Sequence, residues 1–505
     1  MSRREPLRMP LPCRPCPVLR SWAKMTPMLP QRFFSLALLL TACSGDKGGS
    51  TGTPSPAAPL LSVRDGRLLD ASGRQVLLRG INARVEGLFD VTFDDGRIAL
   101  EEIPPFTGED CAFLAETLGM NHLRLPVNWS GIEPHEGTID TGYLERIGTL
   151  VDDCAAVGVL TIVDLHQDAY GKDIGEDGAP LWAIHPPPAE LLEGPLTSAE
   201  LAERRRSPVV LEAFSSLYNN ATLTSGQPVR DAYAAMAAEL AGFLADHPGA
   251  VAIELQNEPV VFGAQDLLDA FHDAVTAEIR AVAPELPVVF EPDAIRNITD
   301  TAVMNTPFPW DQAMYGPHIY TQVFEDGWVS EDTGAIEESI ARSVEEARFH
   351  SAHLYAGEFG NDPRTERGLL FLSTCFDAFD LHQASWALWL YEEHSQDSWG
   401  LYDEGDAPHT RGALRAAAVD VIARGFPTAT AGRLIGLSWD SPSRTLTVRL
   451  EDATSDPHEL AVPVWVYPDG VSATCDGTTA AVRATHPGRA EVVCNGSELV
   501  VFPQG

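Results

Sequence analysis

The sequence predicts an α/β protein: a (β/α)8 TIM barrel with a small C-terminal β-sandwich domain. Eight short apolar segments alternate with amphipathic or Ala-rich helical segments, which is the pattern of a parallel sheet covered by helices. Eight repeats favour a closed barrel over an open doubly wound sheet, and no Gly-rich phosphate loop follows the first segment. The predicted strands are residues 76–83, 122–129, 160–167, 252–258, 288–292, 313–320, 353–359 and 384–391.

The predicted helices lie between these strands, and the sequence pattern changes after the barrel. The helices are residues 110–118, 143–156, 229–246, 267–282, 336–348 and 368–381. Beyond about residue 425, short strand-like segments (432–450, 460–467, 480–484 and 490–502) are separated by Asp-Gly, Pro and Ser turns, as in a β-sandwich. The predicted domains are therefore residues 1–59 (signal and flexible tether), 60–425 (barrel) and 426–505 (β-sandwich).

The composition is that of a globular protein with a strongly acidic surface. The 505 residues are 44% hydrophobic and 21% charged, which allows a large core and one extra domain. The 35 basic and 72 acidic residues give a formal net charge of −37. A surface of this sign repels phosphate backbones, so nucleic acid is not expected as a partner.

The first residues predict an export signal. The apolar run 33–40 is too short to span a bilayer and ends in Leu40-Thr41-Ala42-Cys43. This tetrapeptide resembles a bacterial lipobox, which implies that Cys43 is lipidated and anchors the mature chain to a membrane surface. The expected location is that of an exported bacterial lipoprotein at the outer membrane or cell surface. Cleavage of an ordinary signal peptide near Ala42, with secretion, is the alternative.

Five cysteines follow the predicted anchor, and export permits disulfides. Cys475 and Cys494 flank a hairpin-like stretch and are the first candidate pair. Cys111 and Cys154 lie in successive predicted helices and are a second candidate pair. Cys375 is expected to be a buried helical thiol.

Two carboxylates, Glu258 and Glu358, lie at the C-terminal ends of apolar runs, next to the turn residues Pro259 and Gly360. The C-terminal ends of barrel strands converge on one mouth, so these residues are expected to face each other. A facing pair of carboxylates indicates glycoside hydrolysis, in which one protonates the leaving oxygen and the other attacks or activates water.

Other polar and aromatic residues collect at the same strand ends. They are Arg124, His166, Asp168, Asn257, His318, Tyr320 and Trp389. Each alone has an ordinary structural explanation, such as a satisfied charge, a buried hydrogen bond or plain packing. Their joint placement at one barrel mouth predicts a substrate site.

These motifs resemble glycoside hydrolase family 5, and in particular its endoglycoceramidase branch. The resemblance rests on Arg124, Asp164-Leu165-His166, Asn257-Glu258-Pro259, His318-Ile319-Tyr320, Gly357-Glu358-Phe359-Gly360 and Trp389. For the branch it rests on residues 164–171 and the C-terminal β domain. The resemblance implies a retaining hydrolase that cleaves the bond between a sugar or oligosaccharide and ceramide.

The resemblance also implies a role for each site residue. Glu258 would be the acid/base and Glu358 the nucleophile, and Asn257 would bind the 2-hydroxyl of the reacting sugar. Trp389 would form a platform under the pyranose ring. The remaining polar residues, His166, Asp168 and His318, would hold the sugar or the catalytic carboxylates.

The two catalytic roles predict different protonation states. Arg124 is expected to lower the pKa of Glu358, and Tyr320 to donate a hydrogen bond to it. Apolar surroundings and the neighbouring carboxylate are expected to raise the pKa of Glu258. No cofactor and no metal ion are expected, because the two-carboxylate mechanism requires neither. The expected partners are a glycolipid or oligosaccharide substrate and the membrane surface, and the oligomeric state stays open.

Two alternative functions stay open. Another family 5 β-glycosidase, such as a β-1,4-glucanase (cellulase) or a steryl-glucoside hydrolase, would keep the same carboxylates and differ in its loops. A non-catalytic carbohydrate-binding barrel would be expected to lose one carboxylate, and this sequence has both.

The loop after the third predicted strand, residues 169–228 (the insertion), is far longer than a usual βα connection. It carries apolar clusters in a segment expected at the active-site face. Leu181, Trp182 and Ile184, with Phe262 after the predicted acid/base, predict a groove that holds the lipid. Packing of the insertion against the barrel is an equal alternative.

Overall fold

The computed structural model describes residues 60–324, 333–393, 399–407 and 410–504. The predicted signal segment, the tether and Cys43 lie outside these residues. In the described part of the chain, no helix has both the length and the apolar character needed to cross a bilayer.

Eight parallel strands form a closed barrel in the order β4-β5-β6-β7-β8-β9-β10-β11. The barrel closes where β11 pairs with β4, with Trp386 opposite Arg79. The strands are β4 (Arg79–Asn82), β5 (His122–Val127), β6 (Leu160–Leu165), β7 (Ala250–Glu254), β8 (Val288–Phe290), β9 (Ala313–Tyr315), β10 (His353–Ala356) and β11 (Ser385–Leu388). The predicted (β/α)8 barrel is confirmed.

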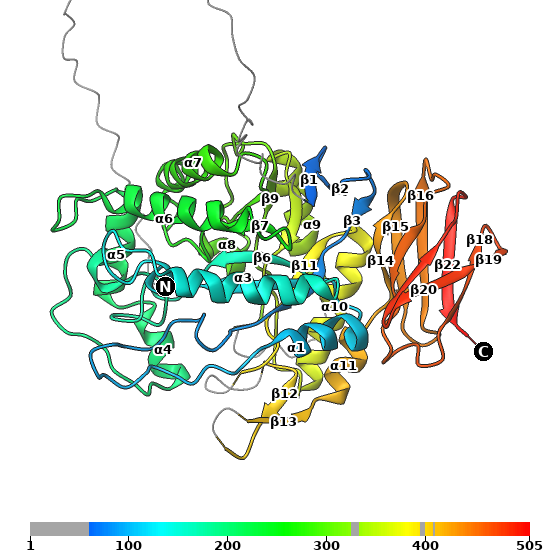
Figure 1. The fold of residues 1–505 in the computed structure, drawn as a ribbon, viewed down its shortest axis with the longest axis horizontal. Helices are drawn as coiled ribbons and strands as arrows, with labels where there is room; N and C mark the ends of the chain where they lie inside the picture. Colours follow the sequence, from blue (N-terminus) through cyan, green and yellow to red (C-terminus); the bar gives the residue numbers. More distant parts are fainter. Residues whose placement is uncertain (1–59, 325–332, 394–398, 408–409, 505) are drawn as a thin grey trace, which may run out of the picture. The chain divides into compact units, whose positions relative to one another are not determined.

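Helices surround the barrel strands (Figure 1). The longer ones are α3 (Thr141–Ala156), α6 (Val229–Leu244), α7 (Gln265–Val282), α9 (Gly334–Phe349) and α10 (Glu366–His382). The insertion contributes a 3-10 turn (Leu181–Ala183), α4 (Ser198–Arg204) and α5 (Pro208–Tyr218). Shorter helices are α1 (Gly108–Phe113), the π-helical turn Leu114–Leu118, α2 (Trp129–Ile132), α8 (Ala294–Thr299) and α11 (Ala416–Ile422).

Helix α3 illustrates how the sequence sets these elements. Asp140 caps its first turn by accepting a hydrogen bond from the backbone N–H of Tyr143. Its buried residues recur every three or four positions, which gives one apolar face against the barrel. That face includes Cys154, which forms a disulfide with Cys111 of α1. The structure also contains the predicted disulfide Cys475–Cys494, and Cys375 is a buried free thiol.

The C-terminal residues form two antiparallel sheets that share a core. One sheet has the order β15-β16-β22-β18-β19 and the other β1-β2-β3-β14-β17-β21-β20. Leu446 and Val501 of the first sheet and Leu460 and Val492 of the second lie in the same apolar cluster, which confirms the predicted sandwich. The strands after the barrel are β12 (Tyr402–Glu404), β13 (Arg411–Leu414), β14 (Phe426–Thr430), β15 (Arg433–Asp440), β16 (Thr445–Glu451), β17 (His458–Ala461), β18 (Val471–Cys475), β19 (Thr478–Ala480), β20 (Val482–His486), β21 (Arg489–Val492) and β22 (Glu498–Pro503).

The first three strands of the described chain belong to this sandwich, although the sequence predicts that their residues are part of the barrel segment 60–425. They are β1 (Leu61–Arg64), β2 (Arg67–Asp70) and β3 (Gln75–Val76), and β3 pairs with β14. The predicted strand 76–83 therefore divides between β3 in the sandwich and β4 in the barrel. One continuous apolar run cannot show which sheet each residue joins.

Candidate active site

Arg124 is the centre of a buried ionic cluster in the barrel. It lies on β5 and is 0% exposed. Its Nη1 donates to Oε1 of Glu358 at 2.7 Å and to Oδ1 of Asn82 at 2.9 Å. Its Nε and Nη2 donate to Glu254 at 2.8 and 3.0 Å, and Nη2 also donates to Asn257 at 2.9 Å. A guanidinium has five donors in one plane, so this single side chain fixes groups from β4, β7 and the loop after β10.

The two candidate catalytic glutamates stand beyond the ends of the strands, not on them as predicted. Strand β7 ends at Glu254 and β10 at Ala356, so Glu258 and Glu358 lie on the loops that follow. Glu258 has a φ of 41°, in the left-handed region that few non-glycine residues adopt. Such strain persists where surrounding contacts hold it, and it is concentrated at functional sites.

Two glycines allow the loop after β10 to pack closely around Glu358. A Cβ at Gly360 would lie 2.2 Å from the carbonyl oxygen of Trp389. A Cβ at Gly357 would lie 3.0 Å from Nε2 of His318. A side chain at either position would displace a site residue.

His318 lies between the two glutamates. Its Nδ1 is 2.9 Å from Oε1 of Glu258 and 3.4 Å from Oε2 of Glu358. One oxygen of each glutamate and one ring nitrogen of His318 all lie within 4.8 Å of one another. The hydroxyl of Tyr320 donates to Oε2 of Glu358 at 2.7 Å, and Asn297 donates to Oε1 of Glu258 at 3.2 Å. The carboxylates therefore face each other, as predicted.

The pKa values of the two glutamates are shifted opposite to the predicted directions. Burial raises the pKa of Glu358 above its usual range, and the positive charges of His318 and Arg124 offset only part of this effect. Burial also acts to raise the pKa of Glu258, but the hydrogen bond and charge of His318 outweigh it and hold that pKa below its usual range. The prediction failed because spacing along the sequence does not show that His318 binds Glu258.

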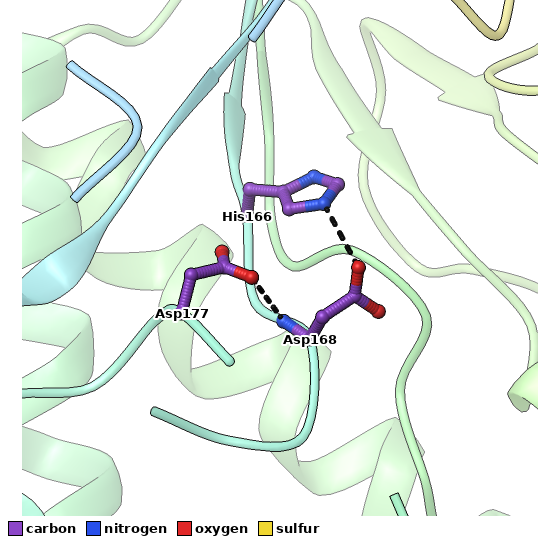
Figure 2. A group of neighbouring side chains, drawn as sticks. All are labelled: His166, Asp168 and Asp177. Atoms are coloured by element: carbon purple, nitrogen blue, oxygen red, sulfur yellow. Dashed lines mark hydrogen bonds and ion pairs between the residues drawn. The ribbon is translucent and has the colours of Figure 1, made fainter. Parts of the chain in front are cut away.

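Strand β6 and the start of the insertion supply a second polar group (Figure 2). Nδ1 of His166 donates to Oδ2 of Asp164 at 2.5 Å, and its Nε2 points toward Oδ2 of Asp168 at 3.7 Å. Asp177 accepts the backbone N–H of Asp168 at 3.0 Å. Burial lowers the pKa of His166, but the charge of Asp164 outweighs it and raises that pKa well above its usual value.

Nε2 of His166 is buried and has no hydrogen-bond partner in the described part of the chain. Asp164 also joins this group to the glutamates, because its Oδ2 lies 3.1 Å from Nη2 of Arg124. The rings of His166 and Trp389 lie parallel, with centroids 5.6 Å apart and planes at 8°. Arg124, His166, Asp168, Asn257, Glu258, His318, Tyr320, Glu358 and Trp389 thus come together at one mouth; Cys43 lies outside the described residues.

Several residues of this site were missing from the sequence prediction. They are Asn82, Glu254, Glu291, Asn297, Asp177, Glu176 and Arg205. Glu254 ends β7 and Glu291 directly follows β8, so the rule of polar residues at strand ends could have found both. Asn297 lies on a short helix and Arg205 in the insertion, where no sequence pattern marks them.

Three groups of His and acidic side chains are close enough to hold a metal ion, although no such cluster was apparent from sequence spacing. They are His166/Asp168/Asp177, Glu254/Glu291/His318 and Glu258/His318/Glu358. Each already contacts cationic side chains. Arg205 lies 3.0 Å from Asp168, and Arg124 lies 2.8 Å from Glu254 and 2.7 Å from Glu358. These charges compensate the carboxylates, and the arrangement is suited to holding and transferring protons.

The prediction of a lipid groove in the insertion is wrong for Trp182 and Ile184. The indole N–H of Trp182 donates to the carbonyl oxygen of Glu133 at 3.0 Å, and its ring packs edge-on against Trp129 at 5.2 Å. Ile184 is buried. Both residues pack the insertion against the barrel, whereas Leu181 and Phe262 are exposed.

A closed (β/α)8 barrel with two facing glutamates at its mouth has the architecture of a glycoside hydrolase. Residues 69–395 match the family model for cellulase (glycosyl hydrolase family 5), and residues 424–497 match that for the glycoside hydrolase family 5 C-terminal domain. The chain belongs to glycoside hydrolase family 5.

Similar proteins include two endoglycoceramidases. The chain is 29% identical to endoglycoceramidase I of Rhodococcus hoagii (strain 103S) over 256 residues, which are 48% of this chain and 48% of that relative. It is 23% identical to an endoglycoceramidase of Cyanea nozakii over 436 residues, 74% of this chain and 77% of the relative. The chain thus spans about half the length of the Rhodococcus protein. The crystal structure of an endogalactoceramidase has a TM-score of 0.72 at 25% identity, covering 88% of this chain and 100% of that one.

Proposed function

We propose that this chain is a retaining endoglycosidase that cleaves the β-glycosidic bond between a sugar or oligosaccharide and ceramide. The observation that carries the retaining mechanism is the approach of Glu258 and Glu358, with one oxygen of each within 4.8 Å. Retaining enzymes hold their carboxyl groups roughly 5 to 5.5 Å apart and inverting enzymes roughly 6.5 to 9.5 Å apart. Similarity to endoglycoceramidases supports ceramide as the aglycone.

Glu358 is the proposed nucleophile. Arg124 and Tyr320 each donate to one of its oxygens at 2.7 Å, which fixes the orientation of the carboxylate. It attacks the anomeric carbon and forms a glycosyl ester while the bond to the ceramide oxygen breaks. The positive charge that develops on the sugar favours the ionised carboxylate.

Glu258 is the proposed acid/base. Its side chain is 21% exposed, and substrate that covers this surface removes water and raises its pKa. Binding thereby favours the protonated acid, which gives its proton to the leaving ceramide oxygen. In the second step the carboxylate removes a proton from water, which hydrolyses the ester and restores the enzyme.

The remaining polar groups are proposed to hold the reacting sugar. The buried Nε2 of His166 offers a donor to a hydroxyl, and Asp168 beside it offers an acceptor. The amide of Asn257 donates one N–H to the carbonyl oxygen of Gln167 at 3.1 Å, which leaves a second N–H for the 2-hydroxyl. Trp389, half-buried beside His166, supplies an apolar plane for the pyranose ring.

The ceramide is proposed to lie on an aromatic rim formed by Phe324 and Trp399. Phe324 is 59% exposed, and its ring stacks on that of Trp399 at 6.1 Å. Both rings contact Tyr320, at 5.7 and 6.0 Å, and Tyr320 binds Glu358. A partly exposed aromatic pair beside the nucleophile suits an apolar aglycone.

The test is a comparison of substrates with the purified protein. Glucosylceramide and lactosylceramide in detergent, a steryl glucoside, cello-oligosaccharides and an aryl β-glycoside are assayed side by side. We expect release of ceramide, with the first-formed sugar in the β configuration by NMR. Efficient cleavage of cello-oligosaccharides with untouched glycosylceramides would assign the chain to a β-1,4-glucanase instead, and cleavage of the steryl glucoside alone would assign it to a steryl-glucoside hydrolase.

We also propose that the protein is an exported bacterial lipoprotein, held at the outer membrane or cell surface by lipid on Cys43. The support is the segment Leu40-Thr41-Ala42-Cys43 after an apolar run, followed by the Gly-, Ser-, Thr- and Pro-rich residues 44–59. A membrane anchor would keep the barrel close to glycolipid substrates. Secretion after ordinary signal cleavage is the alternative.

A further inference from the structure

Arg205 brings a positive charge from the insertion back to the barrel mouth. It is the C-cap residue of α4, in the turn that leads to α5. Its Nη2 lies 3.0 Å from Oδ2 of Asp168 and 3.4 Å from Oε2 of Glu176. The same Oδ2 of Asp168 faces Nε2 of His166, and Asp177 holds the backbone N–H of Asp168 (Figure 2).

We propose that Arg205 is a positioning residue of the glycosidase: it holds the carboxylate of Asp168 in place beside His166. The inference rests on the catalytic assignment of Glu258 proposed above. It gives the insertion a role in the chemistry of the site that is separate from any contact with lipid.

The burial of the partners separates this contact from an ordinary surface ion pair. The side chain of Arg205 is 46% exposed, whereas those of Asp168 and Glu176 are 13% and 2% exposed. Exposed pairs contribute little because water replaces the partner. Here the acceptors are largely withdrawn from water, so loss of Arg205 would leave a carboxylate inside the mouth without its main cationic partner.

The electrostatic effects on Asp168 and Glu258 also support a role for Arg205. Burial would raise the pKa of Asp168, but Arg205 first and His166 next oppose it and hold that pKa below its usual value. At Glu258, burial and to a smaller extent Asp168 act to raise the pKa, while His318 and then Arg205 act to lower it. Removing Arg205 therefore takes away one of the positive charges that lower the pKa of Glu258 and leaves the opposing charge of Asp168.

The experiment compares Arg205→Gln and Arg205→Lys with Arg206→Gln. Arg206 is the exposed neighbour, whose side chain makes no ion pair within the described residues. A soluble aryl β-glycoside is the substrate, so the result does not depend on ceramide. We expect Arg205→Gln to lower kcat/KM by about 10- to 100-fold, because small misplacements at a site cost this much. Its alkaline pH limit should also move to higher pH, because the acid Glu258 stays protonated longer.

Arg205→Lys keeps the charge and should keep the wild-type alkaline limit with part of the activity, and Arg206→Gln should match the wild type. Equal melting temperatures of the variants and the wild type would exclude unfolding as the cause of the lower activity. Identical pH profiles for Arg205→Gln and Arg206→Gln would overturn the proposal.

Crystal structures give a second measurement that needs no activity. The carboxylate of Asp168 should turn away from His166 in Arg205→Gln and stay in place in Arg206→Gln. An unmoved carboxylate in both would overturn the positioning role. If the wild type cleaves the aryl glycoside but no glycosylceramide, the ceramide assignment fails while the comparison of Arg205 variants still decides this proposal.

Discussion

Nδ1 of His318 lies 2.9 Å from Oε1 of Glu258, close enough for the imidazolium to donate a hydrogen bond to the proposed acid/base. Burial lowers the pKa of His318, but the negative charges of Glu291 and Glu358 outweigh it and raise that pKa well above its usual value. The protonation of Glu258 therefore depends on the positive charge of His318. Substrate binding has to shift this balance before the leaving oxygen can be protonated.

Replacement of His318 by Gln tests this relationship. Without the positive charge the pKa of Glu258 rises, so the acid stays protonated to higher pH and the alkaline limit of kcat/KM moves up. kcat should also fall by about 100-fold, because Glu358 loses a neighbouring charge at the reacting centre. An alkaline limit at the wild-type pH, measured on a folded variant, would show that another group sets it.

The two glutamates should differ in chemical rescue. Glu258→Ala and Glu358→Ala are each expected to lose roughly 10²- to 10⁴-fold or more of the activity on an aryl glycoside with a poor leaving group. With a good leaving group, azide should restore turnover only for Glu258→Ala and yield a β-glycosyl azide, since Glu358 still forms the ester. Rescue of Glu358→Ala to a β product would mean that the roles are reversed.

The sequence predicts the barrel well because its eight apolar strands and amphipathic helices repeat a simple pattern. It is less successful where two sheets share one apolar run, as in residues 76–83. The hairpins β1–β2 and β18–β19 were missed although each has a two-residue Asp-Gly turn, Asp65-Gly66 and Asp476-Gly477, with positive φ at both positions. This is the strongest local hairpin signal, so these strands were predictable.

The candidate site is also predictable from the sequence only in part. Side chains that lie just beyond strand ends, such as His166, Glu258 and Glu358, are predictable because the barrel brings all strand ends around one mouth. The pKa order of the glutamates depends on a contact between loops, His318 with Glu258, that no local pattern contains. The position of Arg205 depends on how the insertion folds back, which is a property of tertiary packing.

Acid should destabilise the fold through His272 on α7. The ring is buried beside Phe290 and Phe308, neither nitrogen has a hydrogen-bond partner in the described structure, and burial lowers its pKa to about 3. The unfolded chain, with a histidine pKa of about 6.5, binds the proton more readily. The contribution of neutral His272 to the unfolding free energy is therefore fully present above pH ~6.5. It is lost as the pH drops toward 3, and the loss is about 2 kcal/mol at pH 5.

His272→Phe should remove this pH dependence. The unfolding free energy is measured with denaturant at pH 8 and at pH 5. Its change between the two pH values should be about 2 kcal/mol smaller in the variant than in the wild type. The matched control is His486→Phe, at an exposed position, which should keep the wild-type difference. Equal pH dependence in both variants would show that His272 does not titrate on unfolding.

The anchor proposal predicts that Cys43 carries the lipid. Metabolic labelling with a fatty-acid probe in a bacterial host should tag the wild type and leave Cys43→Ser unlabelled. The variant should also move from the membrane fraction to the soluble fraction. Equal labelling of both proteins would reject the lipobox assignment, and a soluble, unlabelled wild type would favour cleavage near Ala42 and secretion.

The aromatic rim predicts where discrimination for the lipid arises. Burying a methylene contributes about 0.8 kcal/mol, so two methylenes lost from contact with Phe324 correspond to about a tenfold effect. Phe324→Ser should therefore lower kcat/KM for glycosylceramides by about tenfold while the soluble aryl glycoside, which lacks the chains, is cleaved at the wild-type rate.

Two further variants distinguish a lipid contact from general damage. Leu381→Ser replaces a side chain that is 67% exposed on α10 and should leave both substrates unaffected. Trp182→Ser should reduce activity on both substrates together, because Trp182 packs the insertion against Trp129 and Glu133. If Phe324→Ser lowers both activities equally, the rim only supports Tyr320 and Glu358. If it lowers neither, the ceramide lies elsewhere, with the exposed Phe262, four residues after Glu258 in the sequence, as the next residue to test.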